Sequence, residues 1–377
     1  MKWIRTLLTK VEPIQAGIYQ KQSSAQDQPR YRIHLRLQPD GSGVLVVNAA
    51  TVLHLNPAAA EYAYHFIKGT DAVVAAREVA SRYRVNESIA RQDYTDFAAR
   101  IQTLITTPDL DPVSYLDFER VAPHSADLMA PLRLDCALTY RLPPGAPAEY
   151  APTKRVDREL NTEEWMRILD RAWQVGIPHV TFTGGEATLR EDLVQLIGGA
   201  EKNGQVCGLL TDGLKLTDRK YLESLLQSGL DHILLILQPD NALSWKAIQT
   251  IVPADIFMTV HLTLTRQNQA TAAEVLDRLH AAGVRSLSLT SVDAGISSAS
   301  LRNQAANLGL ALKFDLPVPY SIDHPVAQET SEDAVPSGAG KAWLYVEPDG
   351  DVLPAQGMAN QVLGNFLRDP WDKIYRH

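Results

Sequence analysis

The chain has 377 residues, of which 45% are hydrophobic, and it carries a formal net charge of -8 at pH 7. Because domains usually span about 100 to 200 residues, this length predicts roughly two or three domains. The acidic balance argues against binding to nucleic acid or to an anionic membrane. The chain starts without a secretory signal and lacks the run of about 18 apolar residues that spans a membrane, so we expect it in the cytoplasm.

After an N-terminal segment at residues 1–30, residues 31–108 are predicted to form a small domain of strands followed by helices. Apolar and polar residues alternate between 31 and 37, and two further strand candidates follow at 44–47 and 51–55. Asn56 and Pro57 are a typical start of a helix, and two more helices are expected before residue 108. Three strands followed by three helices favour a winged-helix domain. Residues 109–130 are predicted to be a linker.

Strand and helix candidates alternate from residue 131 to about 310, which predicts parallel strands joined by right-handed crossovers. The strand candidates are 132–139, 178–183, 205–211, 231–237, 256–264 and 285–290. The helix candidates are 162–175, 190–203, 217–228, 241–251, 269–282 and 297–308. These repeats predict an α/β fold, a partial (β/α)6 TIM-like barrel with its chemistry at the carboxyl ends of the strands. Residues 311–377 are less regular and are predicted to form a small C-terminal unit.

The loop after the second barrel strand contains Gly184, Gly185 and Glu186. These residues resemble the Gly-Gly-Glu-Pro motif with which radical S-adenosylmethionine (SAM) enzymes bind the amino group of SAM, although Ala187 replaces the proline. Glycines let a backbone approach a ligand closely, and a carboxylate receives an ammonium. The same residues would also serve as a turn between a strand and a helix, and both interpretations stay open.

A second match lies after the third barrel strand, where Thr211-Asp212-Gly213 resembles the Thr-Asn-Gly turn of the same family. The resemblance makes Thr211 and Gly213 candidate SAM-binding residues together with the Gly-Gly-Glu loop. After the fourth strand Gln238 stands where relatives often have an aspartate, which removes a polar contact to a ribose.

The loop after the first barrel strand differs from the family pattern. Family members follow the sequence Thr-Tyr-Arg, here residues 139–141, with three cluster-binding cysteines and an aromatic residue. In this register the cysteine positions hold Leu142, Ala146 and Glu149. The aromatic position holds Tyr150, which the resemblance makes a further candidate SAM-binding residue. Iron–sulfur clusters need thiolate ligands, and one carboxylate is a weak metal site. We therefore expect no catalytic residue, no metal site and no 4Fe–4S cluster, with SAM binding left open.

The chain has two cysteines, Cys136 and Cys207, and both fall within predicted strands. A cysteine inside a strand usually behaves as a small buried apolar residue, and we expect that role for both. Neither is placed to replace the missing cluster ligands.

The C-terminal region resembles the SPASM or twitch extension, which holds auxiliary clusters in related enzymes. Its turns are present, but Ser337 and Ala355 occupy two places where relatives carry thiolate ligands. By this resemblance the C-terminal region is a degenerate SPASM-like extension.

The N-terminal domain resembles the PqqD-like domain through residues 53–60 and the Gly69-Thr70-Asp71 turn. That domain captures a leader peptide as an added strand. Winged helices also bind DNA, but residues 31–108 contain eight basic and seven acidic side chains, which does not favour DNA. The resemblance therefore implies a peptide partner.

Together these resemblances predict a relative of the radical SAM enzymes that mature peptides, including the RiPP and PQQ types. We expect a non-catalytic pseudoenzyme that binds a precursor or leader peptide, or an intact radical SAM maturase. The alternative is an enzyme that uses SAM or another small ligand without an iron–sulfur cluster. No nucleic acid and no membrane are expected among its partners.

Overall fold

The computed structural model describes residues 14–23, 31–48, 51–107, 128–254, 256–291, 295–313, 316–329 and 335–375. The chain divides into two compact units, Met1–Ala122 and Pro123–His377, here called unit 1 and unit 2. Most of the predicted N-terminal segment and most of the predicted linker lie outside the described residues. Among the described helices none is both long and apolar enough to cross a membrane.

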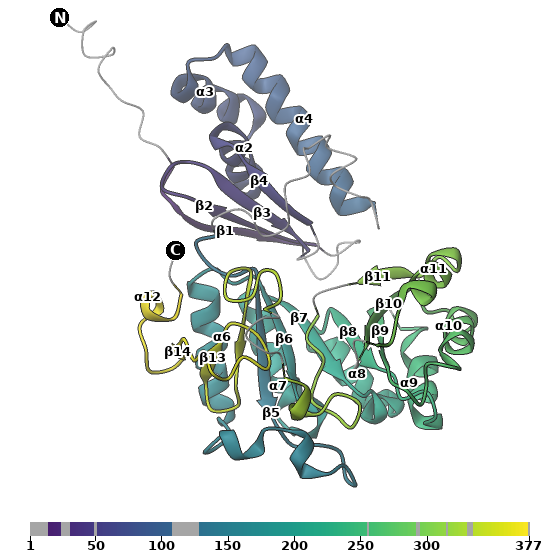
Figure 1. The fold of residues 1–377 in the computed structure, drawn as a ribbon. Helices are drawn as coiled ribbons and strands as arrows, with labels where there is room; N and C mark the ends of the chain where they lie inside the picture. The colour runs from purple at the N-terminus through teal and green to yellow at the C-terminus, as the bar shows by residue number, and fades with distance from the viewer. Residues whose placement is uncertain are drawn as a thin grey trace, which may run out of the picture. The chain divides into compact units, whose positions relative to one another are not determined.

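Unit 1 is an antiparallel four-stranded sheet with three helices on one side of it (Figure 1). Its strands, in their order in the sheet, are β1 (Gly17–Gln22), β2 (Arg32–Leu37), β3 (Gly43–Val47) and β4 (Thr51–Leu55). Its helices are α2 (Pro57–Lys68), α3 (Ala72–Tyr83) and α4 (Glu87–Thr106). The strands β2 to β4 and the three helices fall where the sequence places them.

The sequence signals at the start of α2 act as predicted. The Asn56 side chain accepts a hydrogen bond from the backbone N–H of Ala59 at 2.9 Å, and Pro57 occupies the first helical position. Strand β1 was not predicted. It lies at the edge of the sheet and its residues are only half-buried, so that its sequence shows no clear alternation of apolar and polar residues.

Unit 2 contains a ten-stranded sheet in the order β11-β10-β9-β8-β7-β6-β5-β12-β13-β14. Its first six strands in the sequence are β5 (Arg133–Thr139), β6 (His179–Gly184), β7 (Val206–Thr211), β8 (His232–Ile236), β9 (Phe257–Leu264) and β10 (Ser286–Ser291). They are parallel and alternate with α6 (Thr162–Gln174), α7 (Leu193–Asn203), α8 (Arg219–Gln227), α9 (Ala242–Ile251), α10 (Ala272–Ala281) and α11 (Ala299–Asn307). The predicted α/β fold of six strand–helix repeats is confirmed.

The two faces of this sheet differ in chemistry. One face packs against the helices through a large apolar core that includes Cys136, Phe182 and Trp165. The opposite face is rich in buried hydroxyls and includes His261, whose ring nitrogens lie 3.0 to 3.1 Å from the hydroxyls of three serine or threonine residues. Burial lowers the pKa of His261 to about 3, so it is a neutral core histidine.

The C-terminal region continues the barrel sheet. After the short strand β11 (Ala311–Lys313), β12 (Trp343–Val346) pairs in parallel with β5, and β13 (Asp351–Leu353) and β14 (Gly364–Asn365) extend the sheet further. A short helix, α12 (Trp371–Ile374), ends the described chain. The small separate unit that the sequence suggested is therefore part of unit 2.

Residues 316–329 cross the polar face of the sheet. Val318 packs against Leu210, Leu234 and Ile236 of β7 and β8. The backbone N–H of Tyr320 donates to the carbonyl oxygen of Gly184 at 3.0 Å, at the carboxyl end of β6. This crossing segment therefore reaches the strand ends where a ligand site is expected.

Candidate functional site

Five of the predicted SAM-binding residues come together at the carboxyl ends of β6 and β7, and the sixth, Tyr150, lies in the loop between β5 and α6. The motif Gly184 to Glu186 follows β6, and Thr211 ends β7 just before Gly213. The backbone N–H groups of Gly185 and Glu186 donate to the carbonyl oxygens of Thr139 and Arg141 at 2.8 and 2.9 Å. The loops after neighbouring strands are thus bonded into one surface.

The two glycines of the motif are required by close contact with the backbone that follows β5. A Cβ atom on Gly184 would lie 2.1 Å from the carbonyl oxygen of Thr139, and Gly184 has a φ of +137°. A Cβ atom on Gly185 would lie 2.3 Å from the carbonyl oxygen of Arg141. The sequence left open whether these glycines serve the approach of a ligand or a turn, and in this structure the neighbouring loop occupies the space beside them.

Glu186 is buried and fully hydrogen-bonded. Its Oε1 accepts bonds from the N–H and the hydroxyl of Thr188 at 2.9 and 2.6 Å and from the hydroxyl of Thr211 at 2.8 Å. Its Oε2 accepts the backbone N–H of Asp212 at 2.8 Å. These donors fix the carboxylate at the junction of the two loops.

Asp212 places a second carboxyl group beside Glu186. Burial and the charge of Glu186 together raise the pKa of Asp212 to about 8. Among the described residues no lysine or arginine forms an ion pair with either carboxylate, and the nearby Lys215 donates to the carbonyl oxygen of Thr188 at 2.8 Å. A buried and a half-buried carboxyl group, neither of them ion-paired among the described residues, suit a ligand ammonium, such as the amino group of SAM.

The loop between β5 and α6 carries the predicted cluster positions. Leu142 and Ala146 line a cavity of about 400 Å³, whereas Glu149 is exposed and Tyr150 is half-buried in the short helix η1 (Ala148–Tyr150). This part of the chain offers no thiolate, so its side chains do not fit a cysteine-ligated cluster.

The two cysteines lie away from this loop. Cys136 and Cys207 are fully buried within β5 and β7, and burial raises the pKa of the Cys136 thiol. Their predicted role as small core residues is confirmed.

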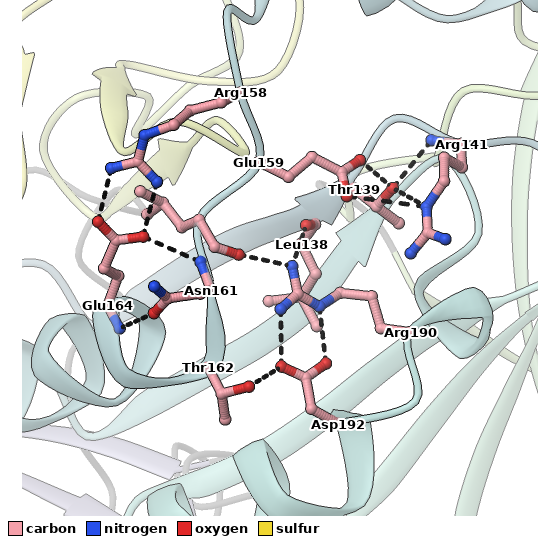
Figure 2. A network of polar contacts seen from close by, with 11 residues as sticks. Leu138, Thr139, Arg141, Arg158, Glu159, Asn161, Thr162, Glu164, Arg190 and Asp192 are labelled. Atoms are coloured by element: carbon pink, nitrogen blue, oxygen red, sulfur yellow. Dashed lines mark hydrogen bonds and ion pairs between the residues drawn. The ribbon is translucent and has the colours of Figure 1, made fainter.

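A network of polar contacts holds the loop between β5 and α6 in place (Figure 2). Arg190 binds both carboxylate oxygens of Asp192 and donates to the carbonyl oxygens of Leu138 and Leu160 at 3.1 and 2.9 Å. The hydroxyl of Thr139 hydrogen-bonds to Glu159. The end of β5 and the start of α6 are therefore fixed by side chains of the protein itself.

A second polar cluster lies where the C-terminal region meets the barrel. The Arg155 Nε donates to Glu347 at 2.7 Å and its Nη1 donates to Glu329 at 2.8 Å. The hydroxyls of Tyr140 and Tyr320 donate to these two carboxylates at 2.9 and 2.8 Å. Sequence analysis missed this cluster because its members come from segments up to 207 residues apart and belong to no motif.

The two predicted auxiliary-cluster positions lie in different surroundings. Ser337 is exposed, whereas Ala355 is buried and lines a cavity of about 280 Å³ beside β5. Their assignment as former ligand positions stays a prediction.

Comparisons with known proteins agree with the fold of the barrel. The family model of the Radical SAM superfamily matches residues 136–296. A PqqA peptide cyclase of Ruegeria pomeroyi is 30% identical over 282 residues, which cover 66% of this chain and 73% of that protein. A PqqA peptide cyclase of Granulibacter bethesdensis is 32% identical over 178 residues, which cover 43% of this chain and 47% of that protein.

Among solved structures, SuiB of Streptococcus suis has the same fold, with a TM-score of 0.58 at 18% identity over 91% of this chain and 87% of that chain. SuiB has also been solved bound to its precursor peptide SuiA and bound to S-adenosylmethionine. A partial barrel with a Gly-Gly-Glu loop at its carboxyl end defines a radical SAM protein. More narrowly, the chain belongs to the peptide-modifying radical SAM family that includes the PqqA peptide cyclases.

These comparisons contradict the prediction that the chain uses no cofactor. The proteins that it resembles belong to a family that works with SAM and a 4Fe–4S cluster, and SuiB has been solved with SAM bound. The prediction took the missing cysteines at positions 142, 146 and 149 as the loss of the 4Fe–4S cluster and left SAM binding open. However, the amino group of SAM is received by a carboxylate, and this structure keeps Glu186 with Asp212 beside it.

Proposed function

We propose that the chain binds a precursor peptide through unit 1 and SAM through Glu186 and Asp212. In this proposal it is a non-catalytic member of the peptide-modifying family, a scaffold that presents the peptide to an intact maturase. The observation that carries the proposal is the pair of adjacent carboxyl groups of Glu186 and Asp212, which form no ion pair among the described residues, at the position of the family's SAM motif.

The peptide-binding part rests on strand β4. It is the last strand in the sheet of unit 1, so one of its sides has no strand partner among the described residues. Leu53 and Leu55 point into the core while His54 is exposed. An added strand would gain backbone hydrogen bonds along β4 with few demands on its sequence. SuiB, solved with its precursor peptide, supports this proposal through the shared fold.

The non-catalytic part rests on the loop after β5. Leu142, Ala146 and Glu149 stand at the positions where relatives carry cysteines. The described residues of this loop are tied to the barrel by their own contacts. A protein that binds the peptide at unit 1 and SAM at Glu186, but does not complete the reaction, would depend on a partner enzyme for the chemistry.

Peptide binding is tested by hydrogen–deuterium exchange of the whole chain with two probes, synthetic PqqA and SuiA peptides, which are named for its relatives. We expect one of them to protect residues 51–55 while β1 is unchanged. The matched control is the same peptide with N-methylated backbone amides, which cannot pair as a strand and should give no protection. Protection elsewhere in unit 1, or none with either probe, would contradict the peptide-binding part.

SAM binding is tested by calorimetry, with Glu186→Gln as the variant and Asp372→Asn, at an exposed position, as the control. We expect SAM to bind the wild type and the control and to bind the variant at least tenfold more weakly. A changed mass of the peptide after incubation of this chain alone with SAM and a reductant would refute the non-catalytic assignment.

A further inference from the structure

A cavity of about 280 Å³ lies beside the amino-terminal half of β5, apart from the Glu186 loop. Asp135 of β5 forms one wall, and the crossing segment 316–329 forms another through Val318 and Tyr320. Tyr320 separates the two places, since its backbone bonds to Gly184 while its side chain lines the cavity. The proposed function uses none of the side chains that line this cavity.

The charged groups around the cavity leave one carboxylate in excess. Arg133 pairs with Asp135 through two hydrogen bonds of 2.8 and 3.0 Å. Arg155, just outside the cavity, is shared between Glu329 and Glu347. Two guanidinium groups therefore face three carboxylates, and the burial of Glu347 raises its pKa, as expected where compensation is incomplete. A third cation would relieve this imbalance among the described residues.

The cavity is lined by a residue with a buried hydrogen-bond acceptor that has no partner among the described residues. Gln356 lines it, and its Nε2 donates to the carbonyl oxygen of Val318 at 2.6 Å, which fixes the orientation of the amide. Its buried Oε1 has no hydrogen-bond partner among the described residues. The lining residue His324 is neutral at pH 7 because burial lowers its pKa. The Gln356 Oε1 would therefore be stabilised by a ligand that donates a hydrogen bond.

Apolar side chains form the rest of the wall. Leu316, Pro317 and Val318 line one part and the Trp343 ring another, with the Arg133 guanidinium 5.0 Å from the centre of that ring. A volume of 280 Å³ equals that of about nine water molecules at about 30 Å³ each, enough for a lysine-sized side chain. Apolar walls with acceptors and excess negative charge suit an aliphatic stem that ends in a cation.

We propose that this cavity binds an aliphatic cation, a primary ammonium or guanidinium on a short hydrocarbon stem. The stem lies against Val318 and Trp343, and the cation lies between Glu329 and the Oε1 of Gln356. Such a group belongs either to a free amine or to a lysine or arginine side chain of a peptide. The second source rests on the proposed function, whereas the cavity itself does not involve unit 1.

The test is ligand-observed NMR on the whole chain with four probes. N-acetyl-lysine-N-methylamide and N-acetyl-norleucine-N-methylamide differ in the ammonium alone, and n-butylamine and cadaverine represent free amines. We expect the lysine derivative to bind at least tenfold more tightly than the norleucine derivative. Tighter binding of the free amines than of the lysine derivative would identify a free amine as the ligand. Equal binding of the lysine and norleucine derivatives, or none, would overturn the proposal.

Two variants locate the binding. Glu329→Gln keeps the shape and removes the charge, and Gln356→Leu removes the free acceptor; each should weaken the lysine derivative about tenfold. Glu274→Gln, at an exposed position of α10, is the matched control and should change nothing. Equal melting temperatures of the wild type and Glu329→Gln show that the variant is folded. Binding that survives in both variants would overturn the proposal, and a failure of peptide binding at β4 would leave this result unaffected.

Discussion

Replacing Asp212 with asparagine should stabilise the protein, increasingly so as the pH rises from about 5 to 8. Burial and the charge of Glu186 raise the pKa of Asp212 to about 8 in the folded protein, whereas in the unfolded chain it has the ordinary aspartate pKa of 3.8. Between these values the folded state binds more protons, so the wild type loses stability as the pH rises. Asparagine carries no charge, and its Oδ1 can still accept the backbone N–H of Leu214, now at 2.9 Å.

The size of the effect follows from the same shift. Between pH 3.8 and pH 7 the wild type should lose roughly 4 kcal/mol of unfolding free energy, at about 1.4 kcal/mol per pH unit. We halve this to about 2 kcal/mol because Asp212 is partly exposed to solvent. Urea unfolding of Asp212→Asn and wild type at pH 5, 6, 7 and 8 measures it, with Asp372→Asn as the surface control. A difference that is independent of pH, or a less stable variant at pH 8, would refute the reasoning.

Two further predictions concern the core around the site. Gly184→Ala should destabilise the protein by about 3 kcal/mol or more, because the new Cβ would clash with the carbonyl oxygen of Thr139. Gly198→Ala, in α7 with open space around it, should instead stabilise the protein by up to about 1 kcal/mol. The same urea titrations measure both variants. An equal effect of the two would contradict the contact argument. Cys136 and Cys207 should not react with a thiol reagent in the folded protein, because both are buried, and denaturation should release two reactive thiols. Rapid reaction of the native protein would contradict the burial of the cysteines in β5 and β7.

The barrel was predictable because its signals are local. The predicted helix 162–175 and strand 178–183 differ from α6 and β6 by one residue at their ends, since the Asn161 cap and the apolar periodicity are visible in the sequence. The parallel pairing of β12 with β5 was not predictable in this way. It joins strands about 200 residues apart, and nothing within either strand marks the other as its partner.

The candidate site was partly predictable for the same reason. Glu186 and Thr211 were found through short motifs, and the structure joins them by a hydrogen bond of 2.8 Å. Arg155 and Glu347 belong to no motif and meet only in the folded chain, so sequence reasoning had no signal for them. Asp212 was visible as a departure from the family's Thr-Asn-Gly turn, but its shifted pKa depends on the burial that folding creates.

The retained motif and the departure from it give different kinds of evidence about ligands. Gly184 and Gly185 are needed by the backbone of Thr139 and Arg141, so their presence would follow from the fold even in a chain that bound nothing. Asp212 is different, because a second carboxyl group beside Glu186 costs stability at neutral pH and no lysine or arginine among the described residues forms an ion pair with it. A residue that lowers stability where an uncharged one would fit is best explained by a ligand that uses its charge. The case for a bound ammonium at this site therefore depends on Asp212 more than on the glycines.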